Sequence, residues 1–147
     1  RDTVSAMASH TRVIVHPVGA CPGNLPEILA GADIVMDCLD SLETRRHLAA
    51  AASRAKIPMV YATVAGDEGF TMLVRPGDEG LLSLCGPEDA VGSPPAETML
   101  GVPTITPAAT AAIQTALAVQ CLLGEEPSGS LLHHLGLGVP QIDGLAL

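Results

Sequence analysis

A short acidic segment behind an apolar run holds the residues best suited to chemistry. Residues 32–38 are nearly continuously apolar at their centre, as in a strand buried on both faces, and Asp40 follows its carboxyl end. Ligands of open α/β sheets bind at such ends, where a carboxylate can hold Mg²⁺ together with substrate phosphates. Asp40 also fits a helix N-cap, with Glu43 three residues later in a capping-box position. Both interpretations remain open, since a capping Asp can offer its second oxygen to a metal.

The elements that would position Asp40 alternate between β-rich and helical patterns, which is typical of an α/β domain with parallel pairing. Strands are expected at residues 12–16, 32–38, 58–64 and 70–75, and helices at residues 2–9, 24–31, 42–56 and 107–123. Residues 65–69 permit a hairpin, and residues 130–135 and 141–147 can form two short edge strands. The proline-rich stretch 76–103 has the length of a binding loop or a lid. The sequence predicts a mixed sheet with flanking helices, partly antiparallel toward the C-terminus.

Composition limits the classes of function. The 147 residues suit one domain, and 48% hydrophobic residues provide for a buried core. Tyr61 and Phe70 are the only aromatic side chains, too few for a platform on which bases stack. A net charge of −9 repels phosphate backbones and anionic lipids. The most apolar stretch, residues 108–123, is interrupted by polar side chains and predicts a buried helix rather than a membrane span. Nucleic acid and membrane are not expected as partners.

The cysteines and the first residues bear on the cell compartment. The four cysteines, at positions 21, 38, 85 and 121, include no C-x-x-C pair. A reducing cytoplasm fits this spacing better than a disulfide-stapled secreted fold. The first residues lack the basic start and apolar middle of a signal peptide, and we expect a chain that begins without Met to be a trimmed product or a fragment.

Residues 32–45, ADIVMDCLDSLETR, resemble the signature of ThiF/MoeB/HesA-type enzymes, bacterial relatives of the ubiquitin-activating enzymes. Later segments resemble family features in the same order, at residues 58–66, 68–76, 82–87 and 101–124, followed by a closing hairpin. The likeness covers almost the whole chain but only the C-terminal part of the family's domain. It implies that residues 1–147 form a single, partial ThiF-type domain with a Rossmann-like sheet.

The resemblance also implies a function. Enzymes of this family bind ATP and Mg²⁺, adenylate the C-terminal glycine carboxylate of a ubiquitin-like or sulfur-carrier protein, release pyrophosphate and usually work as homodimers. Asp40 matches the Asp that coordinates Mg²⁺ in the family. The expected cofactors are therefore ATP and Mg²⁺, and the expected partners are a carrier protein and a second copy. The loop at about residues 78–103 would guide the tail of the carrier.

The departures from the family pattern are equally informative. The Gly-rich nucleotide loop, the ribose-binding acid and the basic phosphate contacts lie upstream of the signature, so we expect the 147 residues alone to be inactive. Leu82 and Cys85 stand where the family has its first C-x-x-C, and no second pair follows, so no zinc is predicted. Cys85 has no basic neighbour to activate its thiol, and no catalytic residue is assigned. Arg45 matches the signature and could support the loop, or it could be an exposed helical side chain.

Two other function classes stay open. The missing C-x-x-C pairs and the missing thiol motivate the first, a degenerate family member that acts as a non-catalytic binding or dimerisation module. The second is a nicotinamide- or flavin-dependent oxidoreductase, which has little support because no G-x-G-x-x-G follows a strand.

Overall fold

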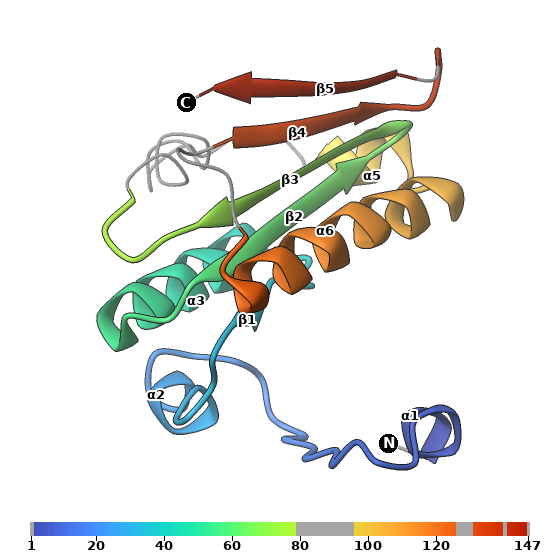
Figure 1. Ribbon diagram of the computed structural model, residues 1–147. Coiled ribbons are helices and arrows are strands. Elements are labelled where there is room, and N and C mark those ends of the chain that lie inside the picture. The colour runs from blue at the N-terminus through green and yellow to red at the C-terminus, as the bar shows by residue number, and fades with distance from the viewer. Residues whose placement is uncertain (1, 79–95, 126–130, 140, 147) are drawn as a thin grey trace.

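A mixed β-sheet organises the chain in the computed structural model, which describes residues 2–78, 96–125, 131–139 and 141–146 (Figure 1). Its five described strands are β1 (Val35–Met36), β2 (Met59–Ala65), β3 (Glu68–Val74), β4 (Leu131–Gly136) and β5 (Gln141–Ala146), in that order across the sheet. β1 pairs with β2 in parallel, and all later pairs are antiparallel. The predicted fold class, a mixed sheet that becomes antiparallel toward the C-terminus, is confirmed.

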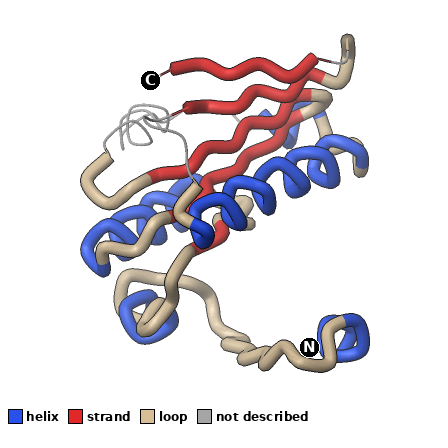
Figure 2. The backbone as a smooth tube through the Cα atoms, in the orientation of Figure 1, coloured by secondary structure: helices blue, strands red, loops and turns tan. Residues whose placement is uncertain are grey.

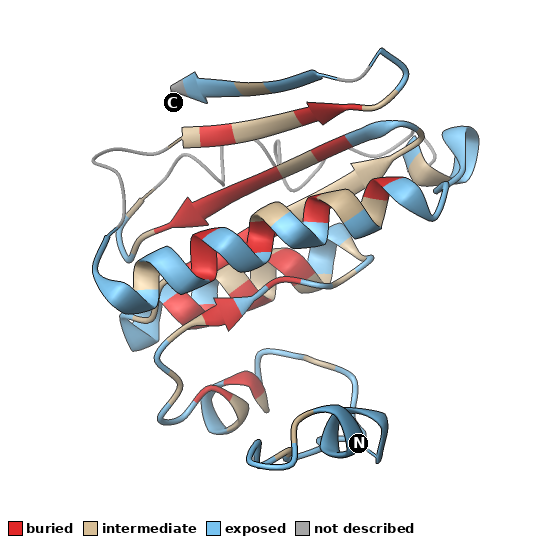
Figure 3. Ribbon diagram, turned by 45° about the vertical axis from the view of Figure 1, so that its right-hand side comes forward, coloured by how far each residue is buried: buried red, intermediate tan, exposed pale blue. Residues whose placement is uncertain are grey.

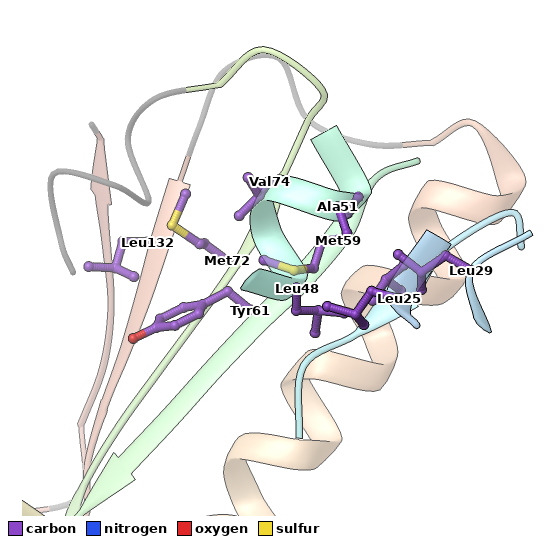
Figure 4. Close-up of a cluster of buried hydrophobic side chains, with 11 residues drawn as sticks. Leu25, Leu29, Leu48, Ala51, Met59, Tyr61, Met72, Val74 and Leu132 are labelled. Atoms are coloured by element: carbon purple, nitrogen blue, oxygen red, sulfur yellow. The ribbon is translucent and has the colours of Figure 1, made fainter. Parts of the chain in front are cut away.

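Two long helices cover opposite faces of the sheet, α3 (Leu42–Ala55) and α6 (Ile105–Leu123). Successive strand residues point to opposite faces, so Met59 and Tyr61 pack toward α3 whereas Val60 packs toward α6. Figure 4 shows Leu48 of α3 close to Met59 in the larger cluster. The short helix α2 (Leu25–Ile28) extends that cluster with Leu25, which is 2% exposed. These contacts fix the carboxyl end of β1 relative to β2 and α3.

α6 confirms the predicted long helix and begins two residues earlier than expected. It ends at Gly124, whose φ of 70° is the left-handed conformation that glycine adopts without strain. Among the described helices, α6 alone has the length and composition of a membrane span, and 28% of it is buried. It is thus less buried than the sequence predicts, because only one side packs on β2 and β3, and its outer side is exposed (Figure 3).

The N-terminal part differs most from the prediction. Helix α1 (Asp2–Met7) is present but has no buried residue, and residues 12–16 form no strand (Figure 2). Ile14 and Val15 are 62% and 55% exposed. A strand needs a hydrogen-bonded neighbour, and no described strand lies beside this β-branched segment. Its composition therefore predicts a strand that the described fold does not pair.

Smaller differences concern element ends. The strand expected at residues 32–38 pairs only at Val35–Met36, and the hairpin turn narrows to Gly66 and Asp67. The stretch expected to be a loop, 76–103, contains α5 (Ala96–Leu100). Its residues 79–95 lie outside the described part of the chain. The two expected edge strands of the tail form β4 and β5, and β5 is largely exposed (Figure 3).

Gly69 of β3 lets α6 approach the sheet closely. A Cβ atom at this position would lie 2.1 Å from Thr110 Oγ1 of α6. Gly69→Ala should therefore lower the free energy of unfolding by about 1–3 kcal/mol through overpacking. Adding Thr110→Ala should recover most of this loss, because the nearest remaining side-chain atom, Thr110 Cβ, lies 3.4 Å from the new methyl group.

Urea denaturation of the two single variants and the double variant measures the coupling between the two positions. Gly23→Ala, which meets nothing closer than 3.9 Å, is the control. Additive losses in the double variant would contradict the contact.

Candidate functional site

A hollow of about 1110 Å³ opens at the carboxyl end of β1, between α3 and α6. The segment from β1 into α3 lines it with residues 37–43 and Arg45, and β2 contributes residues 61–64. The remaining wall comes from α5, α6 and Val102. This is where open α/β sheets bind their ligands, and the volume suits a nucleotide-sized molecule.

A buried ion pair holds the loop after β1. Asp37 is 1% exposed and Arg45 is 9% exposed, with Arg45 Nη1 3.3 Å from Asp37 Oδ2. The guanidinium also donates to the main-chain carbonyl oxygens of Leu39 and Ala62. Asp37 Oδ1 accepts a hydrogen bond from the Leu39 N–H at 3.0 Å. One side chain of α3 thus ties this loop to the edge of β2.

This geometry decides between the two interpretations of Arg45. The side chain supports the loop and is not an exposed helical arginine, and its guanidinium carbon lies 5.3 Å from the centre of the Tyr61 ring. Burial raises the pKa of the Asp37 carboxyl group, while the Leu39 N–H and the Arg45 charge act in the opposite direction. The ion pair offsets part of the cost of burying the Asp37 carboxylate.

Gln114 of α6 completes the support of β1 and is a residue that sequence reasoning missed. Its Nε2 donates to the carbonyl oxygens of Asp37 and Val60, both at 2.9 Å, although the residue is only 4% exposed. Thr106, Thr110 and Gln114 are all buried and recur every four residues, whereas the other two polar side chains of the helix, Thr115 and Gln120, are exposed. That spacing places them on one face, so it is the signal that could have identified them.

Asp40 lies at the hollow, as the sequence predicts, but it does not cap the helix. The N-cap of α3 is Ser41, whose hydroxyl group accepts from the Thr44 N–H at 3.4 Å. The capping interpretation of Asp40 and Glu43 is therefore wrong by one residue, because Ser41 has the extended backbone conformation of a cap. The exposed carboxylate of Asp40 makes no hydrogen bond or ion pair with any described residue.

The residues at this end of the hollow fit Mg²⁺ in one particular way. Among the described residues, no group of three or more His, Cys, Asp or Glu side chains could hold a metal by itself. Mg²⁺ commonly takes one or two protein carboxylates and completes its shell with phosphate and water oxygens. The unengaged Asp40 carboxylate, with exposed Glu43 beside it on the same rim, suits such a shared site.

Acidic side chains outnumber basic ones among the described residues that line the hollow. Besides Asp40 and Glu43, Glu97 of α5 lines it, whereas Arg45 is the only basic lining residue in the described part of the chain. Arg45 is already engaged by Asp37 and two carbonyl oxygens. A triphosphate bound here needs a metal ion and cations from elsewhere, since the described residues offer it no uncommitted positive charge in the hollow.

Among the residues that the structure describes, the thiols and histidines form no second site. Cys38 lines the hollow, but burial and the Asp37 charge raise its pKa, so the thiol is not activated. The two positions discussed for zinc or a nucleophile, Leu82 and Cys85, lie outside the described residues. His134 stacks on Phe70 and contacts Glu68, away from the hollow, while its neighbour His133 belongs to the other face of the sheet.

Arg45→Met should lower the free energy of unfolding by about 3–5 kcal/mol at neutral pH, because it leaves the Asp37 carboxylate buried and unpaired. Burial puts the pKa of Asp37 in the folded state above its ordinary value of 3.8, and loss of Arg45 raises it further. When the pKa of a carboxyl group is higher in the folded than in the unfolded state, the fold loses stability as pH rises from the unfolded-state pKa through the folded-state pKa. The loss in free energy of unfolding caused by Arg45→Met should therefore become smaller as pH falls toward 3.8.

Urea denaturation between pH 4 and pH 8 tests this expectation. The control is Arg54→Met, an exposed position on the same helix that should change stability by less than about 0.5 kcal/mol. A deficit for Arg45→Met that stays constant with pH would show that Asp37 is not the group left unpaired.

Comparison with known proteins gives three findings. The family model described as "ThiF family" matches residues 1–138. Protein HesA of Leptolyngbya boryana is 30% identical over 118 residues, which is 80% of this chain and 42% of HesA. A crystal structure of PaaA superposes with a TM-score of 0.68 at 15% identity, covering 99% of this chain and 52% of PaaA, and so supports the fold. The chain spans about half the length of these relatives or less.

Proposed function

The chain belongs to the ThiF family, and from this premise we propose that it forms the metal-binding side of a site that adenylates the C-terminal carboxylate of a ubiquitin-like or sulfur-carrier protein with ATP. The observation that carries the proposal is the unengaged carboxylate of Asp40 at the mouth of a nucleotide-sized hollow, just beyond the carboxyl end of β1. We propose a cytoplasmic protein with ATP and Mg²⁺ as the small molecules of the reaction.

The reaction requires that the carrier's carboxylate and ATP be positioned next to each other and that the negative charge of the phosphates be neutralised. An oxygen of the carrier's terminal carboxylate forms a bond to the α-phosphorus of ATP, and the bond from that phosphorus to the β-phosphate oxygen breaks, so that pyrophosphate leaves. Mg²⁺ would offset the charge that builds up on the phosphates. Asp40 would hold the ion at the rim of the hollow, and Arg45, acting through Leu39 and Asp37, keeps the loop that carries Asp40 in place.

The acidic hollow favours one alternative. Because the described lining residues offer a triphosphate no uncommitted cation, a non-catalytic module that binds a partner protein is the second candidate. The two candidates differ in one measurable property. The enzyme requires ATP·Mg²⁺ binding that depends on Asp40, whereas the binding module does not.

Asp40→Asn should lower ATP–pyrophosphate exchange by about 10²–10³-fold in the full-length protein, because an amide holds Mg²⁺ less well than a carboxylate. The Mg²⁺ concentration for half-maximal rate should rise, while the melting temperature should not change, since Asp40 is exposed and makes no bond within the described fold. The matched control is Asp33→Asn, an exposed carboxylate that does not line the hollow. Exchange that is unaffected by Asp40→Asn would overturn the assignment. Exchange by the 147 residues alone would contradict the expectation that they are inactive by themselves.

We also propose a homodimer that uses the outer side of α6. No residue from Ile105 to Leu123 is charged, and Val119, Leu122 and Leu123 are 49%, 56% and 65% exposed. In a chain with net charge −9, an uncharged apolar surface is where two copies can meet without repulsion.

Leu122→Arg should therefore shift the full-length protein from dimer to monomer in size-exclusion chromatography with light scattering. The control is Ile142→Arg on β5, a similarly exposed apolar side chain remote from α6 in sequence, which should leave the dimer intact. A monomeric parent protein, or equal effects of both variants, would contradict an interface on α6.

A further inference from the structure

A second cavity, of about 330 Å³, lies between the later part of α3 and the sheet. Residues 42–45, at the start of α3, line the hollow, whereas residues 49–54 of the same helix line this cavity. The start of β2 and the chain that leaves β3, up to Asp78, form the rest of its wall. The two cavities therefore lie at opposite ends of α3, and the proposed adenylation does not use the second one.

Part of the wall of the second cavity is apolar. Met59 and Val74 are directly opposed on β2 and β3, are 2% and 9% exposed, and lie beside α3 (Figure 4). Half-buried Ile57 and two alanines of α3, Ala49 and Ala50, continue this surface. An apolar wall with a few polar groups is typical of small-molecule sites, and the volume falls at the lower end of their range.

The charged side chains of the second cavity reverse the balance of the whole chain. The sequence has 16 acidic and 7 basic residues, but this cavity is lined by two arginines, Arg54 and Arg75, and one acidic residue, Asp78. The hollow has the opposite balance, since its arginine, Arg45, is paired with Asp37. On an acidic protein, a locally basic cavity attracts a small anion.

Arg54 is the side chain that can hold such an anion. It is exposed and forms no hydrogen bond or ion pair within the described part of the chain, whereas Arg75 and Asp78 have interactions of their own. Ser53 adds a hydroxyl group to the same wall. A planar guanidinium group binds a carboxylate or a phosphate through two parallel hydrogen bonds.

The charge of the wall favours a carboxylate over a phosphate. Two arginines and one aspartate leave one net positive charge, and the nearby C-terminal end of α3 adds a partial negative charge. A carboxylate carries one negative charge at pH 7, which this wall matches. A phosphate monoester carries about −1.5 to −2, which exceeds it.

We propose that the second cavity binds a small aliphatic carboxylate, with its carboxylate group on Arg54 and its hydrocarbon chain against Met59 and Val74. This site is separate from the proposed adenylation site, so either assignment can fail without the other. Binding should weaken as the salt concentration rises, because Arg54 is exposed.

Three ligands test the chemical class at pH 7 with the full-length protein, by saturation-transfer NMR. Hexanoate should bind with a Kd of about 1–10 mM, which is ordinary for a ligand of this size. Hexanamide, its neutral counterpart, should bind at least about tenfold more weakly, because it lacks the charge that Arg54 pairs. Equal binding of hexanoate and hexanamide, displacement of hexanoate by an equal concentration of inorganic phosphate, or no saturable binding of hexanoate would each refute the proposal.

Substitution of Arg54 tests the charged contact. Arg54→Met should weaken hexanoate binding about tenfold and leave the melting temperature unchanged. The matched control is Arg12→Met, which removes the same charge from an exposed position outside the cavity and should leave binding unchanged. Equal weakening by both variants would show an effect of net charge alone. A lower melting temperature of Arg54→Met with unchanged binding would show that Arg54 serves the fold. Either result would rule out the contact.

Substitutions of neutral residues test the location. Ala50→Leu enlarges an exposed side chain of the cavity wall and should abolish hexanoate binding, whereas Ala55→Leu, on the same helix but outside the wall, should leave it unchanged. Asp40→Asn should also leave hexanoate binding unchanged, even where it lowers ATP–pyrophosphate exchange. Hexanoate binding that survives Ala50→Leu, or that Asp40→Asn alters as strongly as Arg54→Met does, would place the ligand elsewhere and overturn the inference.

Discussion

The guanidinium group of Arg45 is the constraint on which the site depends. It contacts Asp37, Leu39 and Ala62, and therefore joins the end of β1, the loop that leads to Asp40 and the edge of β2. β1 itself contributes only two paired residues, too few to fix the course of the chain beyond it. A planar group with five donors in fixed directions can satisfy three separated acceptors at once, which a lysine in the same place could not.

The same constraint shapes the chemistry of the hollow. Because the charge of Arg45 is paired with Asp37, it does not neutralise the three carboxylates at the rim, Asp40, Glu43 and Glu97, and the hollow stays acidic. An adenylating site built this way relies on a metal ion, and on cations from outside the described residues, to hold a triphosphate.

Sequence reasoning reached most of the fold, because hydrophobic periodicity and turn residues are local signals. They located α3, α6, the β2–β3 hairpin and the two C-terminal strands, and the motif around Asp40 led to the hollow. The failures have a shared cause. Residues 12–16 have strand composition but no described strand beside them. Ser41 replaces Asp40 as the cap through its backbone geometry, and the sequence left open whether Arg45 is exposed or buried. Each outcome depends on what lies beside the residue in space, which local patterns do not contain. Gln114 is intermediate, since its four-residue spacing with Thr106 and Thr110 was visible but its two carbonyl partners were not.

The polar stripe on the inner face of α6 has a mechanical consequence. Apolar packing alone lets a helix slide along a sheet at small cost, but directional bonds do not. Thr106 donates to the Gly66 carbonyl oxygen at 2.9 Å, near one end of the helix, and Gln114 grips two carbonyl oxygens two turns further on. A shift by one turn, about 5.4 Å, would break all three bonds together. The helix is thus fixed in one position along the sheet. A force on its outer surface would be transmitted to the β2–β3 hairpin and to the end of β1, because the helix cannot slide to relieve it.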